Sequence, residues 1–218
     1  MTKCGSPHGA NAYDCSPRGD ELLKLSEQKA KSELVNLIAS AAGAYTGAVF
    51  KCILPKEFTA DDFRYAQNHL RITSFLYGLL RPLDGIKPYR LEGDVRLPEK
   101  GGLSMFNYWK PLLTDYFMEE IKSRGGVLIN LASGEMKDLF DWKRVEEEVR
   151  VVTPDFQVWK GGQLKTVVIY AKMCRGEMVR YIIKNRIERP EDLRGFSWEG
   201  FAFDEKRSTD SHLLFTLG

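Results

Sequence analysis

The sequence predicts an α+β fold, a single mixed-sheet domain with surrounding helices. Residues 58–80 carry the strongest helical pattern, while residues 149–159 and 163–171 alternate like the two strands of a hairpin. Helices and strands do not follow one another in the strict βαβ order of a parallel α/β fold. The 218 residues suffice for one domain with a buried core, which we assign to residues 21–218.

The N-terminal region predicts a cytoplasmic protein. Residues 1–20 contain Gly, Ser, Pro and Asn without periodicity and are predicted to be disordered, whereas residues 20–40 are predicted to form a helix. The first twenty residues contain no apolar stretch of the kind that a secretion signal needs, and no apolar run is long enough to span a membrane. Without export, disulfides are not expected between the cysteines at positions 4, 15, 52 and 174.

The helix predicted over residues 58–80 has a recognisable start. Thr59 is the expected N-cap, and Asp62 follows three residues later as in a capping box. Phe58 and Phe63 can pack against each other across this cap. A loop is expected after this helix, as far as about residue 100. The residues expected to end the helix are Gly78 and Pro82.

The second half of the chain predicts two further helices and the sheet. Residues 107–122 form an amphipathic helix, and residues 127–131 form a short buried strand followed by a helical turn. Residues 176–185 are predicted as a helix, and the aromatic tail 195–215 as a closing strand. The apolar side of the helix at 107–122 consists of Trp109, Leu112, Leu113, Tyr116 and Phe117.

Positive charge is clustered although the formal net charge is only +2. One basic cluster lies within residues 71–96 and a second within residues 172–189, while acidic residues concentrate elsewhere. This asymmetry is compatible with a positive face that attracts anions, although charge alone favours two ordinary solvated helix faces. The second cluster consists of Lys172, Arg175, Arg180, Lys184, Arg186 and Arg189.

Polar side chains follow two of the predicted strands. Residues 127–131 lead to Asn130, Ser133 and Glu135, and the strand predicted to end near Tyr170 leads to Lys172 and Arg175. Strand ends and the helix starts beside them are common places for anionic ligands. The two cations are also explained if their aliphatic parts simply lie along the surface with the charge in water.

Several classes of site lack their sequence signals. There is no Gly-x-Ser-x-Gly turn, P-loop or Gly-x-Gly-x-x-Gly motif, so hydrolase, nucleotide-hydrolysing and dinucleotide-binding sites are not indicated. His69 is predicted to be structural. Cys4, His8 and Cys15 do not have the spacing of a common zinc site. We therefore expect no cofactor and no metal.

The segment of residues 76–92 combines cations, carboxylates and prolines with apolar residues. Arg81, Lys87 and Arg90 can face a phosphate backbone, and Tyr77 and Tyr89 can stack on exposed bases. The alternative is a structural role, in which Arg–carboxylate pairs clamp a rigid loop. The full run is Leu76-Tyr-Gly-Leu-Leu-Arg-Pro-Leu-Asp-Gly-Ile-Lys-Pro-Tyr-Arg-Leu-Glu92.

This run closely resembles the signature of the YaaA family, the bacterial peroxide-stress proteins. Other family-like motifs occur in the same order along residues 41–215. They are Tyr45-Thr-Gly-Ala-Val-Phe50, the helix from Asp62 to Arg71, Asn130-Leu-Ala-Ser133 with Glu135, Tyr170-Ala-Lys with Arg175-Gly, and Gly200-Phe with Phe203.

The resemblance implies a DNA-binding protein of the response to hydrogen peroxide that also helps to limit damage driven by free iron. It implies a YaaA-type fold with a basic cleft and a helix-hairpin-helix-like element, in which the hairpin would be the turn from Tyr77 to Ile86 with its flanking helices. The partner would be double-stranded DNA, including distorted or bulged DNA, with no membrane. The DNA-binding residues would be Arg71, Arg81, Lys87, Arg90, Lys172, Arg175 and Arg180.

An enzyme acting on a nucleotide, a base or a nucleic acid in the same cleft is the alternative. Its candidate catalytic residues are Asn130, Ser133, Glu135, Tyr170 and Lys172. The chain also departs from the family pattern. Ser6-Pro7-His8-Gly9 stands where the family has a strand ending in Ser-Pro-Ala-Lys, so the sequence is identified as an N-terminally divergent or truncated member.

Overall fold

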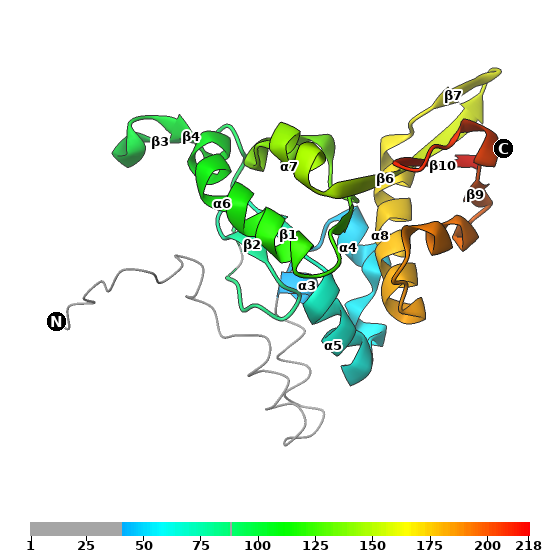
Figure 1. Ribbon diagram of the computed structural model, residues 1–218, viewed down its shortest axis with the longest axis horizontal. Coiled ribbons are helices and arrows are strands. Elements are labelled where there is room, and N and C mark those ends of the chain that lie inside the picture. Colours follow the sequence, from blue (N-terminus) through cyan, green and yellow to red (C-terminus); the bar gives the residue numbers. More distant parts are fainter. Residues whose placement is uncertain (1–40, 88) are drawn as a thin grey trace.

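The computed structural model describes residues 41–87 and 89–218 (Figure 1). The predictions for residues 1–20 and 20–40 lie outside this part of the chain. The described residues combine several helices with a curled mixed sheet, which confirms the α+β prediction. The α-helices are α3 (Ala41–Ala44), α4 (Ala48–Ile53), α5 (Ala60–His69), α6 (Met105–Lys122), α7 (Trp142–Glu148) and α8 (Val168–Asn185). Short 3₁₀-helices are η1 (Pro55–Glu57), η2 (Pro98–Lys100), η3 (Gly134–Leu139), η4 (Pro190–Gly195) and η5 (Glu205–Arg207).

Six of the described strands form the main sheet, in the order β5-β6-β10-β9-β8 with β7 paired to the end of β6. β5, β6 and β10 run parallel, and the remaining pairs are antiparallel. These strands are β5 (Val127–Ile129), β6 (Arg150–Lys160), β7 (Gln163–Lys165), β8 (Ser197–Trp198), β9 (Phe201–Phe203) and β10 (His212–Leu217). Two small hairpins pair β1 (Ile72–Ser74) with β2 (Gly78–Leu80), and β3 (Arg96–Leu97) with β4 (Leu103–Ser104).

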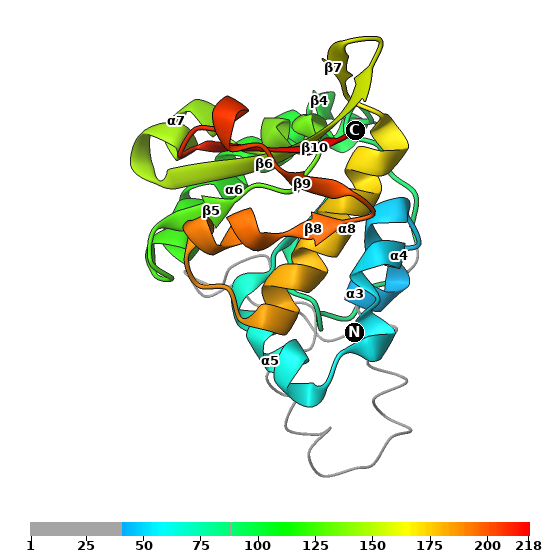
Figure 2. The same cartoon turned by 90° about the vertical axis from the view of Figure 1, so that its right-hand side faces the viewer.

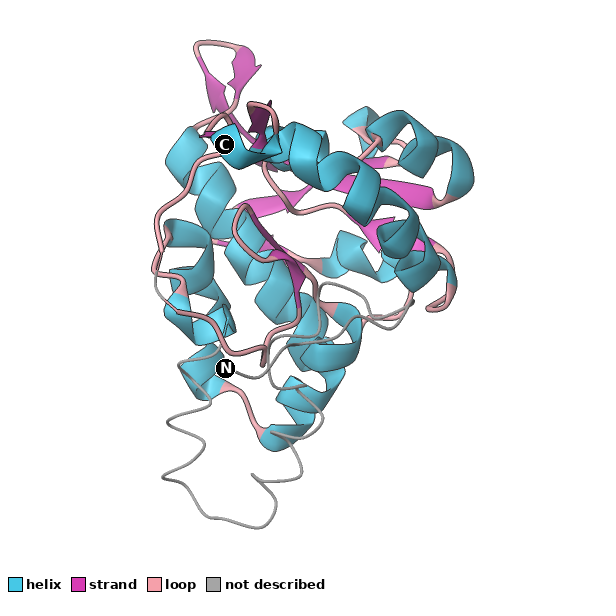
Figure 3. Ribbon diagram, turned by 90° about the vertical axis from the view of Figure 1, so that its left-hand side faces the viewer, coloured by secondary structure: helices cyan, strands magenta, loops and turns pink. Residues whose placement is uncertain are grey.

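The two faces of β6 are covered by different helices. Successive side chains of a strand point to opposite faces, so Val151 and Val152 face different layers. Val152 and Phe156 pack with residues of α8 and β10, whereas Val151 packs with the core of α6 and α7. The sheet therefore has helices on both sides, as Figures 2 and 3 show.

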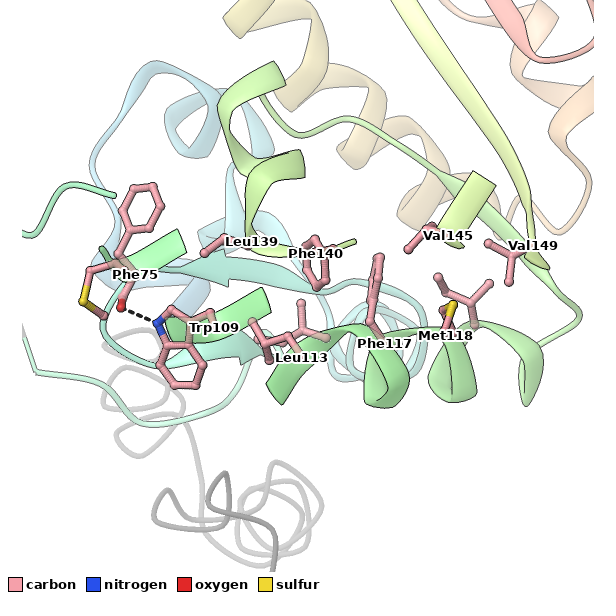
Figure 4. Close-up of a cluster of buried hydrophobic side chains, with 12 residues drawn as sticks. Phe75, Trp109, Leu113, Phe117, Met118, Leu139, Phe140, Val145 and Val149 are labelled. Atoms are coloured by element: carbon pink, nitrogen blue, oxygen red, sulfur yellow. Dashed lines mark hydrogen bonds between the residues drawn. The ribbon is translucent and has the colours of Figure 1, made fainter. Parts of the chain in front are cut away.

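The core under α6 is aromatic. The Trp109 indole donates a hydrogen bond to the Phe75 carbonyl oxygen over 2.7 Å, and the rings of Phe117 and Phe140 stack with centroids 4.3 Å apart (Figure 4). The helix predicted at 107–122 is confirmed as α6, although Leu112 is exposed rather than part of the core. None of the helices in the described part of the chain is long and apolar enough to cross a lipid bilayer.

The hairpin predicted for residues 149–171 is confirmed in its first strand, its turn and the first three residues of its second strand. β6 turns at Gly161 and Gly162, both with left-handed φ, as predicted, but β7 ends at Lys165 and residues 168–171 belong to α8. The β-branched run at 166–169 favours a strand locally. Residues from Val168 onward are nevertheless helical, because helical spacing places Ala171, Cys174 and Met178 together against the sheet.

The aromatic tail also differs from its prediction. It contributes β8, β9 and β10, and β10 lies inside the sheet between β6 and β9 rather than closing an edge. Its buried residues Leu213 and Phe215 alternate toward α8, and the rings of Phe215 and Phe156 stack with centroids 5.4 Å apart. The C-terminal strand is therefore central to the core.

The helix predicted at 58–80 is wrong in its second half. Its start is confirmed, because the Thr59 N–H and side chain form the capping box with Asp62, and the Phe58 and Phe63 rings lie 5.5 Å apart. The helix ends at His69, however, and residues 72–80 form the β1–β2 hairpin. Gly78 allows this turn with a left-handed φ of 77°, and a side chain there would press on Trp109. Residues 77–86 consequently lie in β2 and a loop, and β1 rather than a helix precedes them, so the expected helix-hairpin-helix element is not confirmed.

One buried carboxylate joins α5 to the end of α8. Asp62 accepts hydrogen bonds from the Thr59 N–H (2.9 Å), Lys184 Nζ (2.6 Å) and Arg186 Nη2 (2.8 Å), and it is 3% exposed. Burial alone would raise the pKa of the Asp62 carboxyl, but the bonds from Lys184, Thr59 and Arg186 outweigh it and hold the pKa well below its usual range. The ionised form therefore stabilises the fold.

Replacing Asp62 by Asn should lower the free energy of unfolding at neutral pH by about 3 kcal/mol, since two cations lose a buried partner but remain partly hydrated. A depressed native pKa contributes stability above the unfolded pKa of about 4, and this contribution is lost as the pH falls below it. Thermal melting across this range should show a loss on acidification that is smaller in Asp62→Asn. The control Asp61→Asn, at an exposed neighbour, should melt like the wild type. Equal acid sensitivity in Asp62→Asn would contradict this role.

Candidate nucleic-acid interface

The basic residues of the segment at 172–189 fall into two groups, those that form ion pairs within the protein and those that do not. In its C-terminal half, Lys184 and Arg186 bind Asp62, and Arg189 pairs with Asp192 over 2.7 Å. Arg180 pairs with Glu57 over 2.5 Å, and its Nη1 is buried with no hydrogen-bond partner among the described residues. Most of this charge is therefore used to hold α8 in place.

Lys172 and Arg175 are different. Neither side chain has a hydrogen bond or an ion pair with any residue in the described part of the chain, although Arg175 is half-buried. They are three residues apart on α8 and so share one face of the helix. The first turn of α8 has no acidic residue, and cations near a helix N-terminus are mildly unfavourable unless an anion is close. This pair is the part of the segment that is free to bind an anion.

The loop of residues 81–92 uses its first arginine internally. Asp84 accepts the Arg81 N–H over 2.7 Å, and its side chain lies 3.5 Å from Arg81 Nε, so the pair clamps the start of the loop. Arg90 is largely exposed and lies 3.6 Å from Glu92, and the Lys87 side chain is also exposed. The structural interpretation therefore applies to Arg81, whereas Lys87 and Arg90 are exposed to solvent.

The tyrosines of this segment are bound inside the protein. The Tyr89 hydroxyl lies 2.6 Å from the Ser74 hydroxyl and 2.9 Å from that of Tyr45, and the Tyr77 hydroxyl accepts the Lys87 N–H over 3.1 Å. The rings of Tyr77 and Tyr89 also meet edge to face. Burial raises the pKa of Tyr45 well above its usual range, with a further rise from Tyr89, although a hydrogen bond with Ser74 lowers it. Both Tyr77 and Tyr89 thus hold the loop, and stacking on bases would first require them to leave this cluster.

Arg71 likewise has partners inside the protein. Its guanidinium pairs with Glu120 on α6, and its Nη1 donates to the carbonyl oxygens of Gln67 (3.1 Å) and Leu70 (2.9 Å). Arg71 thereby ties the C-terminal end of α5 to α6. Its position favours a structural role over a contact with DNA.

No hydrogen bond or ion pair joins the candidate catalytic residues to one another in the described part of the chain. Asn130 is buried after β5 and accepts the Ala132 N–H, and Ser133 and Glu135 lie at the start of η3. Tyr170 and Lys172 are two residues apart in α8, so they point to different sides of the helix. Tyr170 lies against Phe201 of β9, with ring centroids 6.4 Å apart.

Comparisons with known proteins show the family of this chain. The family model described as "Peroxide stress protein YaaA" matches residues 11–207. The chain belongs to the YaaA peroxide stress family. A UPF0246 protein of Phocaeicola vulgatus is 74% identical over 80% of this chain and 68% of its own length, and one of Porphyromonas gingivalis is 52% identical over 82% and 70%. A UPF0246 protein of Paraburkholderia phytofirmans is 41% identical over 79% of this chain and 66% of its own length.

Close packing of α4 against α8 positions the free cations of this YaaA-family chain. A Cβ at Gly176 would lie 2.2 Å from the Val49 carbonyl oxygen and 2.7 Å from the Cys52 Cβ. Gly176 follows Arg175 directly, so the backbone that carries Arg175 is held against α4. Sequence reasoning marked the Arg175-Gly pair as a family motif but gave no signal for this contact.

Replacing Gly176 by Ala should force α4 and α8 apart and lower the free energy of unfolding by about 1–3 kcal/mol, the usual cost of overpacking. Thermal or urea unfolding measures this directly. Gly134→Ala is the matched control, since a Cβ there meets no atom within 4 Å. Similar stability of the two variants would show that the helices adjust without cost.

Proposed function

We propose that this protein binds double-stranded DNA through its phosphate backbone during the response to hydrogen peroxide. Membership of the peroxide stress family supports the setting. The observation that carries the binding proposal is the contrast within α8 and the residues after it. Arg180, Lys184, Arg186 and Arg189 are paired within the protein, whereas Lys172 and Arg175 have no partner among the described residues.

The chemistry of this pair suits phosphates rather than base sequence. A guanidinium and an ammonium group on one helix face bind phosphate oxygens, which are the same at every base pair. Such contacts fix the position of a protein on DNA without reading its sequence. Selection among DNA molecules would then depend on shape, so bent or bulged duplexes are the expected preferred partners. Lys87 and Arg90 are the further candidates for phosphate contacts.

We extend the proposal to damage driven by free iron. Ferrous ions near the DNA backbone produce hydroxyl radicals from peroxide at the place where they do most harm. A protein that neutralises phosphates releases the cations condensed on them. Binding through Lys172 and Arg175 would therefore reduce the iron held at the DNA surface.

Replacing Lys172 and Arg175 together by Gln should weaken binding to all duplexes alike and lower the slope of log affinity against log salt by about two, since each phosphate contact contributes about 0.9. Gln keeps much of the aliphatic part of each side chain. Fluorescence anisotropy with labelled duplex across a salt series measures both quantities.

The matched control for this experiment is the double variant Arg64→Gln with Arg189→Gln. It removes the same charge, but from cations that are paired with Asp61 and Asp192. It should keep the wild-type slope. Equal losses of affinity and slope in both double variants would mean that binding depends on overall charge. An unchanged slope in Lys172→Gln/Arg175→Gln would show that these two residues do not contact phosphates.

The iron proposal is tested by nicking of supercoiled plasmid with ferrous iron and peroxide. Wild-type protein should protect the plasmid at concentrations that saturate it, and Lys172→Gln/Arg175→Gln should not. Raised salt should abolish protection in parallel with binding. Protection that persists without binding would point to a direct reaction of the protein with iron or peroxide instead.

A further inference from the structure

The first turn of α8 exposes three consecutive apolar side chains. Val168 is 65% exposed, Ile169 50% and Tyr170 40%. We call these three residues the apolar tip. Single exposed apolar residues are common on protein surfaces, but three in a row at one helix turn expose a continuous apolar surface over much of that turn.

The geometry of a helix explains this exposure. Successive residues point about 100° apart, so the three side chains together surround most of the turn. The next residue, Ala171, is already buried against the sheet, with 3% exposure. Figure 2 shows this end of α8 at the margin of the molecule, next to the β6–β7 hairpin. The tip therefore projects from a rigid helix whose remaining turns are packed.

Charge around the tip favours an anionic partner. Lys172 and Arg175 lie four and seven residues after Val168, which places all three on one face of α8. Lys165, at the end of β7, is exposed just before the helix begins. The first turn has no acidic residue. An apolar tip beside unpaired cations matches a partner that offers both phosphates and flat apolar surface.

We propose that the apolar tip contacts the faces of unstacked bases where a duplex is opened by a bulge or gap, while Lys172 and Arg175 hold the adjacent phosphates. This inference rests on the proposed function and specifies how the same site distinguishes opened DNA. Apolar side chains can insert between separated bases, and a tyrosine ring can stack on one. Contact between Tyr170 and Phe201 limits the freedom of that ring before binding. In an intact duplex the base faces are covered, so only the phosphate contacts remain.

The test compares wild-type protein with the double variant Ile169→Ser/Tyr170→Ser on an intact duplex and on the same duplex with a two-nucleotide bulge. The wild type should prefer the bulged duplex by about tenfold or more, the value of stacking on one base. The variant should lose this preference while its affinity for the intact duplex and its salt slope stay unchanged. A 2-aminopurine in the bulge should change its fluorescence with the wild type and not with the variant.

The matched control is Val95→Ser/Leu103→Ser, which removes two exposed apolar side chains beside β3 and within β4. It should keep the preference for the bulge. Thermal melting of both variants shows whether the tip is covered by another part of the chain, because a covered tip would make Ile169→Ser/Tyr170→Ser melt clearly lower than the control.

The outcomes separate the two proposals. The proposed contact of the apolar tip with bases is overturned if the wild type binds intact duplex without preferring the bulge, or if the preference survives in the tip variant. Either result leaves the proposal of phosphate binding intact. A clear loss of stability with unchanged discrimination shows that the tip packs within the protein, and also overturns it. If the tip variant loses binding to anionic vesicles but not to DNA, the partner is a membrane surface. No wild-type binding to any DNA overturns the proposed function itself.

Discussion

The carboxylate of Asp62 is the contact on which the arrangement of α8 depends. It closes the capping box of α5 and, on its other side, binds two cations from the end of α8. Ion pairs at the surface add little to stability because water competes for both charges. This one is buried on the acid side, so the carboxylate has no alternative partners and α8 cannot slide along α5 without leaving a charge unpaired.

Anchoring one end of α8 uses some of its basic residues and leaves others without a partner in the described part of the chain. Lys184 and Arg186 satisfy Asp62, Arg180 satisfies Glu57, and the packing at Gly176 holds the middle of the helix against α4. The first turn of α8 has no acidic residue, and Lys172 and Arg175 have no ion pair with any other described residue. A helix that is fixed at one end can present charge at the other without loss of order.

The sequence correctly predicted those structural features that depend on residues close together in the chain. The capping box of Thr59 and Asp62 and the glycine turn of the β6–β7 hairpin depend on neighbours in sequence, and both are confirmed. The start of α8 was missed because its β-branched residues resemble a strand, and only burial of Ala171 and Cys174 against the sheet favours the helix. The partner of each cation could not be predicted either, since Asp62 and Arg186 are 124 residues apart and the fold alone brings them together.

The loop of residues 81–92, like α8, contains both cations that are paired within the protein and cations that are exposed. Its Arg81–Asp84 pair and the hydroxyl contacts of Tyr89 hold two points of the backbone, while Lys87 between them and Arg90 after Tyr89 reach solvent. Under the proposed function, these internal contacts would reduce the entropy lost when the exposed cations bind phosphates. Bending DNA to fit a protein surface costs free energy that depends on the flexibility of the DNA, so binding of this kind would select DNA by shape without contacting a base edge.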